Sequence, residues 1–308
     1  MRSSTLAILA LAAAAPAASA APYDLHGTSL AQTTHVYFID VTAPLCSLSG
    51  VCAGCASGTV QDWVEATILA AQAWSDPFVT GADFRYVFGG FIAGSPVPPT
   101  YPANVSVVSL GTSCVGYPGG GVFQTCMFGD IPFDVSGNPA SGCFDLQGSS
   151  VHQMGHALGL NHTTVPGASM YTQSPTALEW RTIEADDIAG VQAIYGALPP
   201  NKAVLDYTGT PFTGRTILLR LFNVAGVAWI GFDTDPGPSS VLGLPIELGF
   251  STYFFAYPRF APALIPISLP PTPVLAGLTV FSQALVFTSP GGVPAVQISN
   301  PVRISIPY

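Results

Sequence analysis

The sequence predicts an α+β domain followed by an all-β sandwich domain. Helical periodicity occurs only before residue 196 of the 308-residue chain. Beyond residue 203, short apolar runs alternate with turn residues at the spacing typical of a sandwich. Between these regions, Leu198-Pro199-Pro200-Asn201 forms a stiff connector. We therefore expect domains at residues 21–197 and 204–308, joined by a linker at residues 198–203.

Residues 1–20 have the pattern of a secretory signal peptide. Arg2 precedes an apolar stretch at residues 6–15, and an Ala-Ser-Ala cleavage pattern follows. The apolar stretch is shorter than the roughly 20 residues that a membrane span requires. The most apolar later segment, residues 260–281, contains five prolines and would not form a membrane helix. We expect an exported, secreted chain that begins near Ala21 and has no membrane span.

The composition indicates a folded protein with an acidic front domain. Only 8% of the residues are charged, whereas 49% are hydrophobic, which is typical of a packed globular chain. Residues 21–200 contain 13 acidic side chains and two basic ones, while residues 201–308 contain four acidic and five basic ones. The acidic front domain argues against nucleic acid or an anionic membrane as a partner.

The cysteines are expected to form disulfides. All six lie in the front domain, and an even number in an exported chain favours three bridges, for which 15 connectivities exist. Cys114 with Cys126 is one expected pair. A redox pair or half of a zinc knuckle at Cys52 and Cys55 is the alternative, but no second closely spaced pair accompanies it. The six are Cys46, Cys52, Cys55, Cys114, Cys126 and Cys143.

The front domain is predicted to alternate strands and helices. Residues 35–41 have the β-branched and aromatic content of a buried strand, and residues 59–75 place apolar side chains on one helical face. Asp145 is a suitable N-cap for a helix that continues to Leu158, and Gly159 can end it in the left-handed conformation. The remaining elements are strands at residues 84–88, 105–110 and 122–133 and a last helix at residues 185–195.

The rear domain is predicted to consist of strands alone. It has no cysteine, no histidine and no clear helical periodicity. Its aromatic residues between Phe250 and Tyr257 are expected in the sandwich core. The predicted strands are residues 216–222, 227–232, 251–257, 264–269, 278–287, 295–299 and 302–306.

Three histidines have the spacing of a zinc site. His152 and His156 are four residues apart, so a helix directs both imidazoles to the same side, about one turn apart. Gly159 breaks the helix and allows His162 to return to the same ion. Three imidazoles leave a fourth position open, which is typical of catalytic rather than structural zinc. The other histidines, His26 and His35, show no such spacing and are expected to be ordinary strand or turn residues.

This run resembles the HExxHxxGxxH motif of the metzincin proteases, and specifically of the matrixin family. Phe144-Asp145-Leu146-Gln147 before the helix and residues 186–196 after it are also similar to matrixins. Met170, eight residues after His162, resembles the methionine of the Met-turn, which packs beneath the metal. The resemblance covers residues 34–196. It implies a metzincin-like fold of a mixed sheet plus helices, one zinc ion, and hydrolysis of peptide or protein substrates.

One residue departs from the family pattern where the chemistry is carried out. Gln153 stands at the position of the general-base glutamate. In the family mechanism this carboxylate accepts the proton of the attacking water, and a neutral amide cannot do so. Loss of a positioned acid–base group lowers rates by roughly 10²–10⁴. We therefore expect Gln153 to be non-functional as a base and proteolysis to be weak or absent.

Other acidic residues are not expected to replace the glutamate. Glu179, Glu184, Asp186 and Asp187 all follow the Met-turn. The resemblance places Asp186 and Asp187 on the last helix behind the site, where they are expected to act as helix-start charges and structural hydrogen-bond partners. Asp130 and Asp134 lie in acidic loops that are candidates for Ca²⁺, without a motif to support them. The histidine count excludes the second, histidine-bound structural zinc that is common in matrixins.

Three functions compete on this basis. The first is a secreted matrixin-like zinc metalloendopeptidase with impaired hydrolysis. The second is a zinc-binding pseudoprotease that retains the substrate cleft to bind peptides or proteins. In the third, the rear domain acts as a surface-adhesion or carbohydrate-binding module. A monomer is expected in each case.

Overall fold

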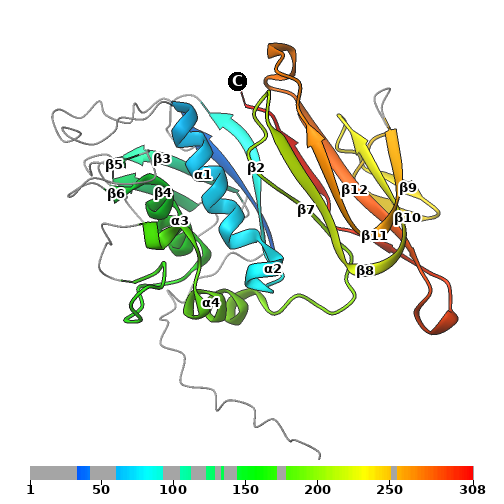
Figure 1. Cartoon of the computed structure of the whole chain (residues 1–308), viewed down its shortest axis with the longest axis horizontal. Coiled ribbons are helices and arrows are strands. Elements are labelled where there is room, and N and C mark those ends of the chain that lie inside the picture. The colour runs from blue at the N-terminus through cyan, green and yellow to red at the C-terminus, as the bar shows by residue number, and fades with distance from the viewer. Residues whose placement is uncertain are drawn as a thin grey trace, which may run out of the picture.

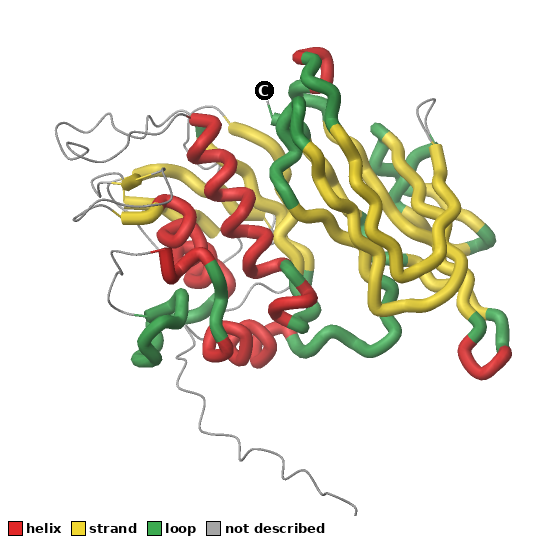
Figure 2. Tube along the Cα trace, viewed as in Figure 1, coloured by secondary structure: helices red, strands yellow, loops and turns green. Residues whose placement is uncertain are grey.

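A computed structural model describes residues 33–41, 60–92, 105–111, 123–128, 133–134, 144–171, 178–250 and 255–307. Helices occur in the front part and a large set of strands in the rear part (Figures 1 and 2). The predicted signal peptide, all cysteine side chains, and the side chains of Asp130 and Asp134 lie outside the described residues, as does His26. Within the described part, no helix is both long and apolar enough to cross a membrane.

A four-stranded sheet forms one layer of the front part. Its strands are β1 (Thr34–Asp40), β2 (Arg85–Ile92), β3 (Val105–Gly111) and β4 (Phe123–Phe128), in the order β2-β1-β3-β4. All three pairings are parallel. The α+β prediction is confirmed, although the antiparallel strand that a mixed sheet requires is not among the strands described in this layer. A short parallel pair, β5 (Phe133–Asp134) with β6 (Phe144–Asp145), precedes the histidine helix.

Helices cover this sheet at the predicted positions. The helices α1 (Val60–Ser75) and α3 (Leu146–Leu158) contact each other, and α4 (Ala185–Tyr195) follows them in the chain. Two short elements were not predicted, α2 (Pro77–Thr80) and the 3-10 turn η1 (Leu178–Arg181). Both are single turns of four residues, too short to produce a periodic pattern.

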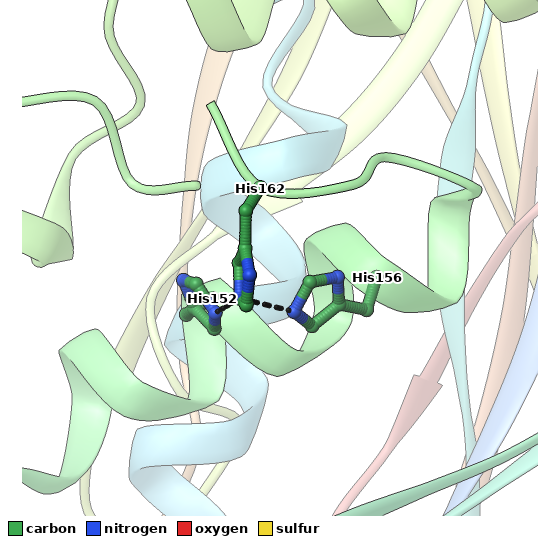
Figure 3. A group of neighbouring side chains, drawn as sticks. All are labelled: His152, His156 and His162. Atoms are coloured by element: carbon green, nitrogen blue, oxygen red, sulfur yellow. Dashed lines mark hydrogen bonds between the residues drawn. The ribbon is translucent and has the colours of Figure 1, made fainter. Parts of the chain in front are cut away.

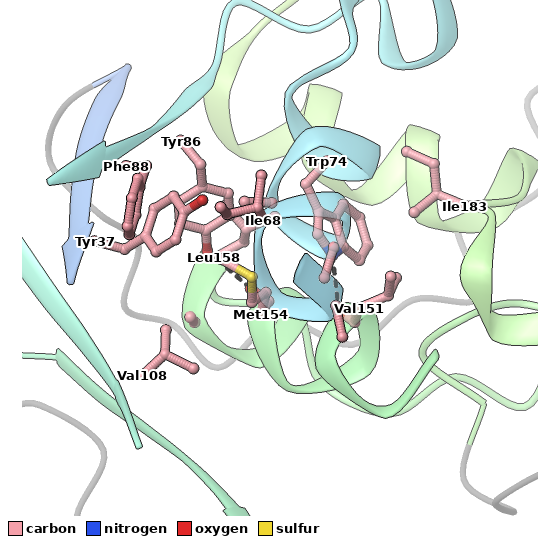
Figure 4. Packing of buried hydrophobic residues seen from close by; sticks show 14 of the residues in the cluster. Tyr37, Ile68, Trp74, Tyr86, Phe88, Val108, Val151, Met154, Leu158 and Ile183 are labelled. Carbon is pink, nitrogen blue, oxygen red and sulfur yellow. Dashed lines mark hydrogen bonds between the residues drawn. The ribbon is translucent and has the colours of Figure 1, made fainter. Parts of the chain in front are cut away.

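The core of the front part holds α3 in place (Figure 4). Trp74 of α1 is fully buried and its indole Nε1 donates to the backbone oxygen of Val151, at 2.8 Å. Tyr86 of β2 donates its hydroxyl to the oxygen of Met154, at 2.9 Å. Both acceptors lie on α3. The helix is therefore attached through its backbone to α1 on one side and to the sheet on the other.

The rear part contains strands and short 3-10 turns within residues 204–250 and 255–307, so the all-β prediction is confirmed. Six strands form one antiparallel sheet, and two more form a ribbon. A hydrophobic core that includes Leu219 and Ile230 of β8 is built from buried side chains of this sheet. The described strands thus form one large sheet and one two-stranded sheet, not two large facing sheets, and the sandwich arrangement stays a prediction. The strands are β7 (Val204–Thr208), β8 (Thr216–Asp233), β9 (Ser239–Val241), β10 (Leu244–Ile246), β11 (Phe255–Ser268), β12 (Thr279–Thr288), β13 (Ala295–Ile298) and β14 (Val302–Ser305).

Three expectations for the rear part were wrong. The runs at residues 216–222 and 227–232 are one strand, β8, interrupted only by a register shift opposite Ala261 and Ala263. The bulge interrupts the alternation of apolar residues, which is why these two runs resemble two strands. The described end of the run at residues 251–257 and the run at residues 264–269 likewise belong to one strand, β11, which is continuous from Phe255 to Ser268. Phe250, expected in the core, is 42% exposed because it lies in a loop after β10 with a φ of 55°.

Ion pairs and aromatic contacts join the front and rear parts. Arg220 of β8 binds Asp206 of β7 through Nε and Nη2, at 2.9 and 2.6 Å, and reaches Asp76 before α2, at 3.2 Å. The rings of Phe78 and Phe222 lie 4.3 Å apart across the same boundary. The side chains of Arg220 and Asp206 are each only 12% exposed. The boundary between the two parts therefore buries charged groups in addition to apolar side chains.

Replacing Arg220 with Met would leave two carboxylates without their shared cation. We expect the free energy of unfolding to fall by about 3–5 kcal/mol, the range for breaking a buried pair from one side. The matched control is Lys202→Ala, which breaks a more exposed pair with Asp83 across the same boundary and should lower it by less than about 1 kcal/mol. Urea unfolding measures both, and equal losses would contradict the expectation.

Candidate metal centre

The helix that carries two of the histidines begins at a strong cap. Asp145 accepts a hydrogen bond from the backbone N–H of Gly148, at 2.7 Å, as an N-cap residue does. Its carboxylate also pairs with Arg181 of η1, whose Nε donates to Oδ2 at 2.8 Å. The predicted cap is confirmed, and Arg181 adds a charge partner that no sequence pattern indicated.

The helix ends at Gly159, as predicted. Gly159 has a φ of 100°, and its N–H donates to the oxygen of His156, at 2.9 Å. The next N–H, from Leu160, reaches back to the oxygen of Gly155, at 3.1 Å. These two bonds form a Schellman turn, which reverses the chain without leaving helix carbonyls unpaired. The chain then returns His162 toward the helix.

The three predicted histidines converge on one point (Figure 3). The Nε2 atom of His162 lies 3.2 Å from Nε2 of His152 and 3.2 Å from Nε2 of His156. Nitrogens bound tetrahedrally to zinc at 2.0–2.1 Å are separated by about 3.3 Å. The spacing of these nitrogens therefore fits a zinc ion, and this three-histidine group could bind a metal.

Backbone carbonyls orient two of the imidazoles. His152 donates from Nδ1 to the oxygen of Ser169, at 2.6 Å, and His156 donates from Nδ1 to the oxygen of Leu160, at 2.9 Å. Because a carbonyl only accepts, the Nδ1 atoms carry the protons and the Nε2 atoms present lone pairs. Such lone pairs repel one another unless a cation lies between them. Carbonyl partners of this kind are usual for metal-binding histidines.

Burial also favours the metal-binding form of His152. Burial lowers the pKa of this imidazole to about 4, against the hydrogen bond to Ser169, which raises it, while His162 lowers it further. The ring is therefore neutral at physiological pH. A neutral imidazole is the form that binds a metal.

Met170 and Asp187 hold the loop beneath the histidine helix. The side chain of Met170 is buried against α3 at Gly155, where a Cβ would clash with the Met170 sulfur. The backbone N–H groups of Ser169 and Met170 donate to the carboxylate of Asp187, at 2.7 and 3.1 Å, and that of Glu184 donates at 2.9 Å. The prediction that Asp187 is a structural hydrogen-bond partner is confirmed.

Of the other residues that the sequence analysis considered, Gln153 lies beside the histidines on α3, and His35 lies outside the group of three. Gln153 is half-buried on α3, directly after His152. His35 is buried on β1, outside the group of three, and burial lowers its pKa to about 3. The side chain of Glu179 lies outside the described residues. Sequence reasoning missed Trp180, whose indole is stacked on the His152 ring, because a lone tryptophan in an aperiodic loop carries no signal.

Comparisons with known proteins agree with this geometry. Residues 117–196 match the matrixin family, peptidase M10. The chain is 30% identical over 118 residues to Metalloendoproteinase 1 of Glycine max, covering 38% of this chain and 37% of that protein. It is 45% identical over 49 residues to Matrilysin of Mus musculus, covering 16% of this chain and 19% of that protein. The matrixin resemblance is thus confirmed, while the matched part spans well under half of these relatives.

A solved structure, wild type OgpA from Akkermansia muciniphila, covers 90% of this chain and 94% of its own at 10% identity. Its TM-score is 0.26, and a value this low supports no comparison of the two folds. The matrixin family itself implies zinc, which agrees with the three-histidine group.

Zinc should stabilise the folded chain measurably. At a free concentration about 100 times its dissociation constant, we expect the free energy of unfolding to rise by about 2.7 kcal/mol, because the unfolded chain lacks the assembled site. His162→Ala should remove most of this gain, while Thr164→Ala, an exposed neighbour in the same loop, should keep it. Thermal unfolding with zinc and with a chelator measures the difference. Equal stability under both conditions would contradict a metal site.

Proposed function

Because residues 117–196 match the matrixins, we propose that the chain is a zinc-binding matrixin homologue whose peptide-bond hydrolysis is impaired or absent. The family match supports a metalloendopeptidase-like function. One observation carries the proposal. Three imidazole nitrogens meet at zinc-like spacing, while the neighbouring position on the same helix is a neutral amide, Gln153.

Each residue of the centre has a defined role in this proposal. His152, His156 and His162 bind the ion, and Met170 supports the helix beneath them. When bound, zinc supplies Lewis-acid activation of water and of the scissile carbonyl. Asp187 holds the backbone of Ser169, whose carbonyl in turn orients His152. Residues of this chain therefore supply both the groups that bind the ion and the groups that orient His152.

Gln153 limits the chemistry of a bound substrate. Its amide can hold a water molecule by a hydrogen bond, but it cannot take up a proton and deliver it to the leaving amine. Turnover should therefore lie roughly 10²–10⁴ below that of a carboxylate at this position. Peptides or unfolded proteins are the proposed ligands. Holding such ligands without cleaving them, as a pseudoprotease, is the alternative outcome of the same geometry.

Location and assembly belong to the same proposal. The predicted signal peptide at residues 1–20 and the cysteine content support a secreted protein. We propose residues 21–197 as the metallopeptidase-like domain, residues 198–203 as the linker, and residues 204–308 as an accessory sandwich domain. A monomer is proposed. The acidic front part supports neither nucleic acid nor an anionic membrane as a partner.

Gln153→Glu tests the proposal directly. We expect this variant, loaded with zinc, to cleave an unstructured protein substrate about 10²–10⁴ times faster than the unaltered chain, because a proton acceptor is restored. Gln153→Ala is the control and should show no gain. Initial rates of fluorogenic peptide release measure the difference. Rapid cleavage by the unaltered chain, abolished by a chelator, would contradict the impairment.

A surface-adhesion role for the rear part has one observation in its favour. Phe260, Val227, Phe287 and Val296 lie directly opposite one another across β11, β8, β12 and β13. Their exposed fractions are 80, 42, 38 and 36%, and Trp229 in the adjacent row is 52% exposed. The solvent face of an antiparallel sheet is usually polar. An exposed apolar band of this kind is typical of a binding surface.

We propose an uncharged polysaccharide as the occupant of this band. Neither row contains an ionised side chain, and Pro258, Leu285 and Ile298 complete the second row. Two rows over four strands span roughly 20 by 13 Å, far less than the ~800 Å² per partner of a stable protein interface. A sugar chain fits this size, since the C–H faces of sugar rings stack on aromatic side chains.

The full-length chain with both Trp229→Ala and Phe260→Ala tests the second role. We expect retention on microcrystalline cellulose or chitin to fall at least tenfold, because two stacking surfaces are lost. Leu242→Ala with Val274→Ala is the control, since both are exposed apolar residues outside the band. Sedimentation with the insoluble polysaccharide measures the bound fraction. Failure of the unaltered chain to bind either material would contradict the role.

A further inference from the structure

Trp180 covers one face of a metal-binding imidazole. Its indole lies 4.7 Å from the ring of His152, with 14° between the two planes, which is a stacked arrangement. Trp180 is only 6% exposed although it belongs to a short turn between helices. None of the roles assigned above uses it. A large aromatic side chain in that position requires its own explanation.

Trp180 is attached to the same helix that carries His152. Its neighbour Arg181 binds Asp145, the N-cap of α3. At Gly148, a Cβ would lie only 3.1 Å from the Cβ of Trp180, so the lack of a side chain there allows the turn to approach the helix closely. The backbone of the turn that carries the indole is therefore held against α3, the helix that carries His152.

The stack restrains the rotation that the hydrogen bond leaves free. The bond from Nδ1 of His152 to Ser169 directs one edge of the ring, but the ring plane can still rotate about that direction. A parallel indole on one face restrains this rotation, and it favours offset stacking over other orientations. Metal ligands need their lone pairs within about 10–20° of the productive direction.

The three imidazoles lie in different planes. The ring of His156 lies at 88° to that of His152 and at 64° to that of His162, and the rings of His152 and His162 lie at 32° to each other. The indole of Trp180 stacks on the His152 ring. The plane of His152 is therefore the one that the tryptophan fixes, relative to which the other two nitrogens are set.

We propose that Trp180 is a positioning residue for the metal centre, which orients the His152 imidazole by stacking on it. This inference rests on the proposed zinc-binding function. Through Arg181 and Asp145, it makes the start of α3 and the turn before α4 part of the same centre.

Full-length variants separate positioning from simple packing. Trp180→Leu keeps an apolar side chain without an aromatic face, and Trp180→Phe keeps a smaller aromatic face. Phe250→Leu removes an exposed aromatic ring from the loop after β10, outside both proposed binding sites, and is the control. The zinc dissociation constant is measured by competition with a chromophoric chelator. The ring-proton chemical shifts of His152 in the metal-free chain are measured by NMR, because a stacked indole shifts them upfield.

Trp180→Leu should weaken zinc binding by about 10–100-fold, as loss of an orienting partner does, and should remove the upfield shift. Trp180→Phe should lie between this variant and the unaltered chain, and Phe250→Leu should change neither quantity. Unchanged zinc affinity in Trp180→Leu, or unchanged His152 shifts, would overturn the inference.

A second variant covers the case in which Trp180→Leu does not fold, and the unaltered chain separates failure of this inference from failure of the proposed function. If Trp180→Leu does not fold, Arg181→Met loosens the turn but keeps the indole, and it should weaken zinc binding to a smaller extent; unchanged affinity there overturns the inference. Failure of the unaltered chain to bind zinc contradicts the proposed function. Zinc binding that Trp180→Leu leaves intact contradicts this inference alone.

Discussion

The turn at Gly159 is the constraint on which the metal centre depends. A straight continuation of α3 would carry the chain away from the point where His152 and His156 meet. The left-handed residue instead lets Leu160 donate back to the oxygen of Gly155, and the chain reverses. The same Leu160 then accepts the bond from Nδ1 of His156. Leu160 therefore both closes the turn after Gly159 and orients His156, and His162 arrives where its nitrogen completes the group.

The supports of this centre come from three separate segments. The carbonyl of Ser169 orients His152, and the carboxylate of Asp187 holds the backbone of that residue from α4. Met170 lies against α3 from the other side of the loop. A carboxylate that accepts three backbone N–H groups gives the loop a fixed path, because each donor would otherwise be buried without a partner. The geometry of the three-histidine group is thus set in part by hydrogen bonds that its own side chains do not make.

Metal binding and hydrolysis place different demands on this helix. Binding needs neutral imidazoles with fixed planes. Backbone carbonyls orient His152 and His156, and burial and the stacked indole add to this for His152. Hydrolysis needs in addition a group that exchanges a proton, and Gln153 is an amide. A protein can therefore retain the first property while the second is lost. The rear part is joined to the front part through Arg220 and Asp76. It adds a surface whose exposed aromatic side chains are independent of either property.

The sequence alone determined the helix of residues 146–158, its cap at Asp145, its end at Gly159 and the three histidines, because each depends on local spacing or a single residue's backbone preference. It also indicated Asp187 as a structural partner and the all-β character of the rear part. Only the tertiary structure decided that Trp180 lies on His152, that β8 is one bent strand, and that Arg220 joins the two parts. These contacts connect positions far apart in the chain, and no local pattern records which distant side chain will fill a given space.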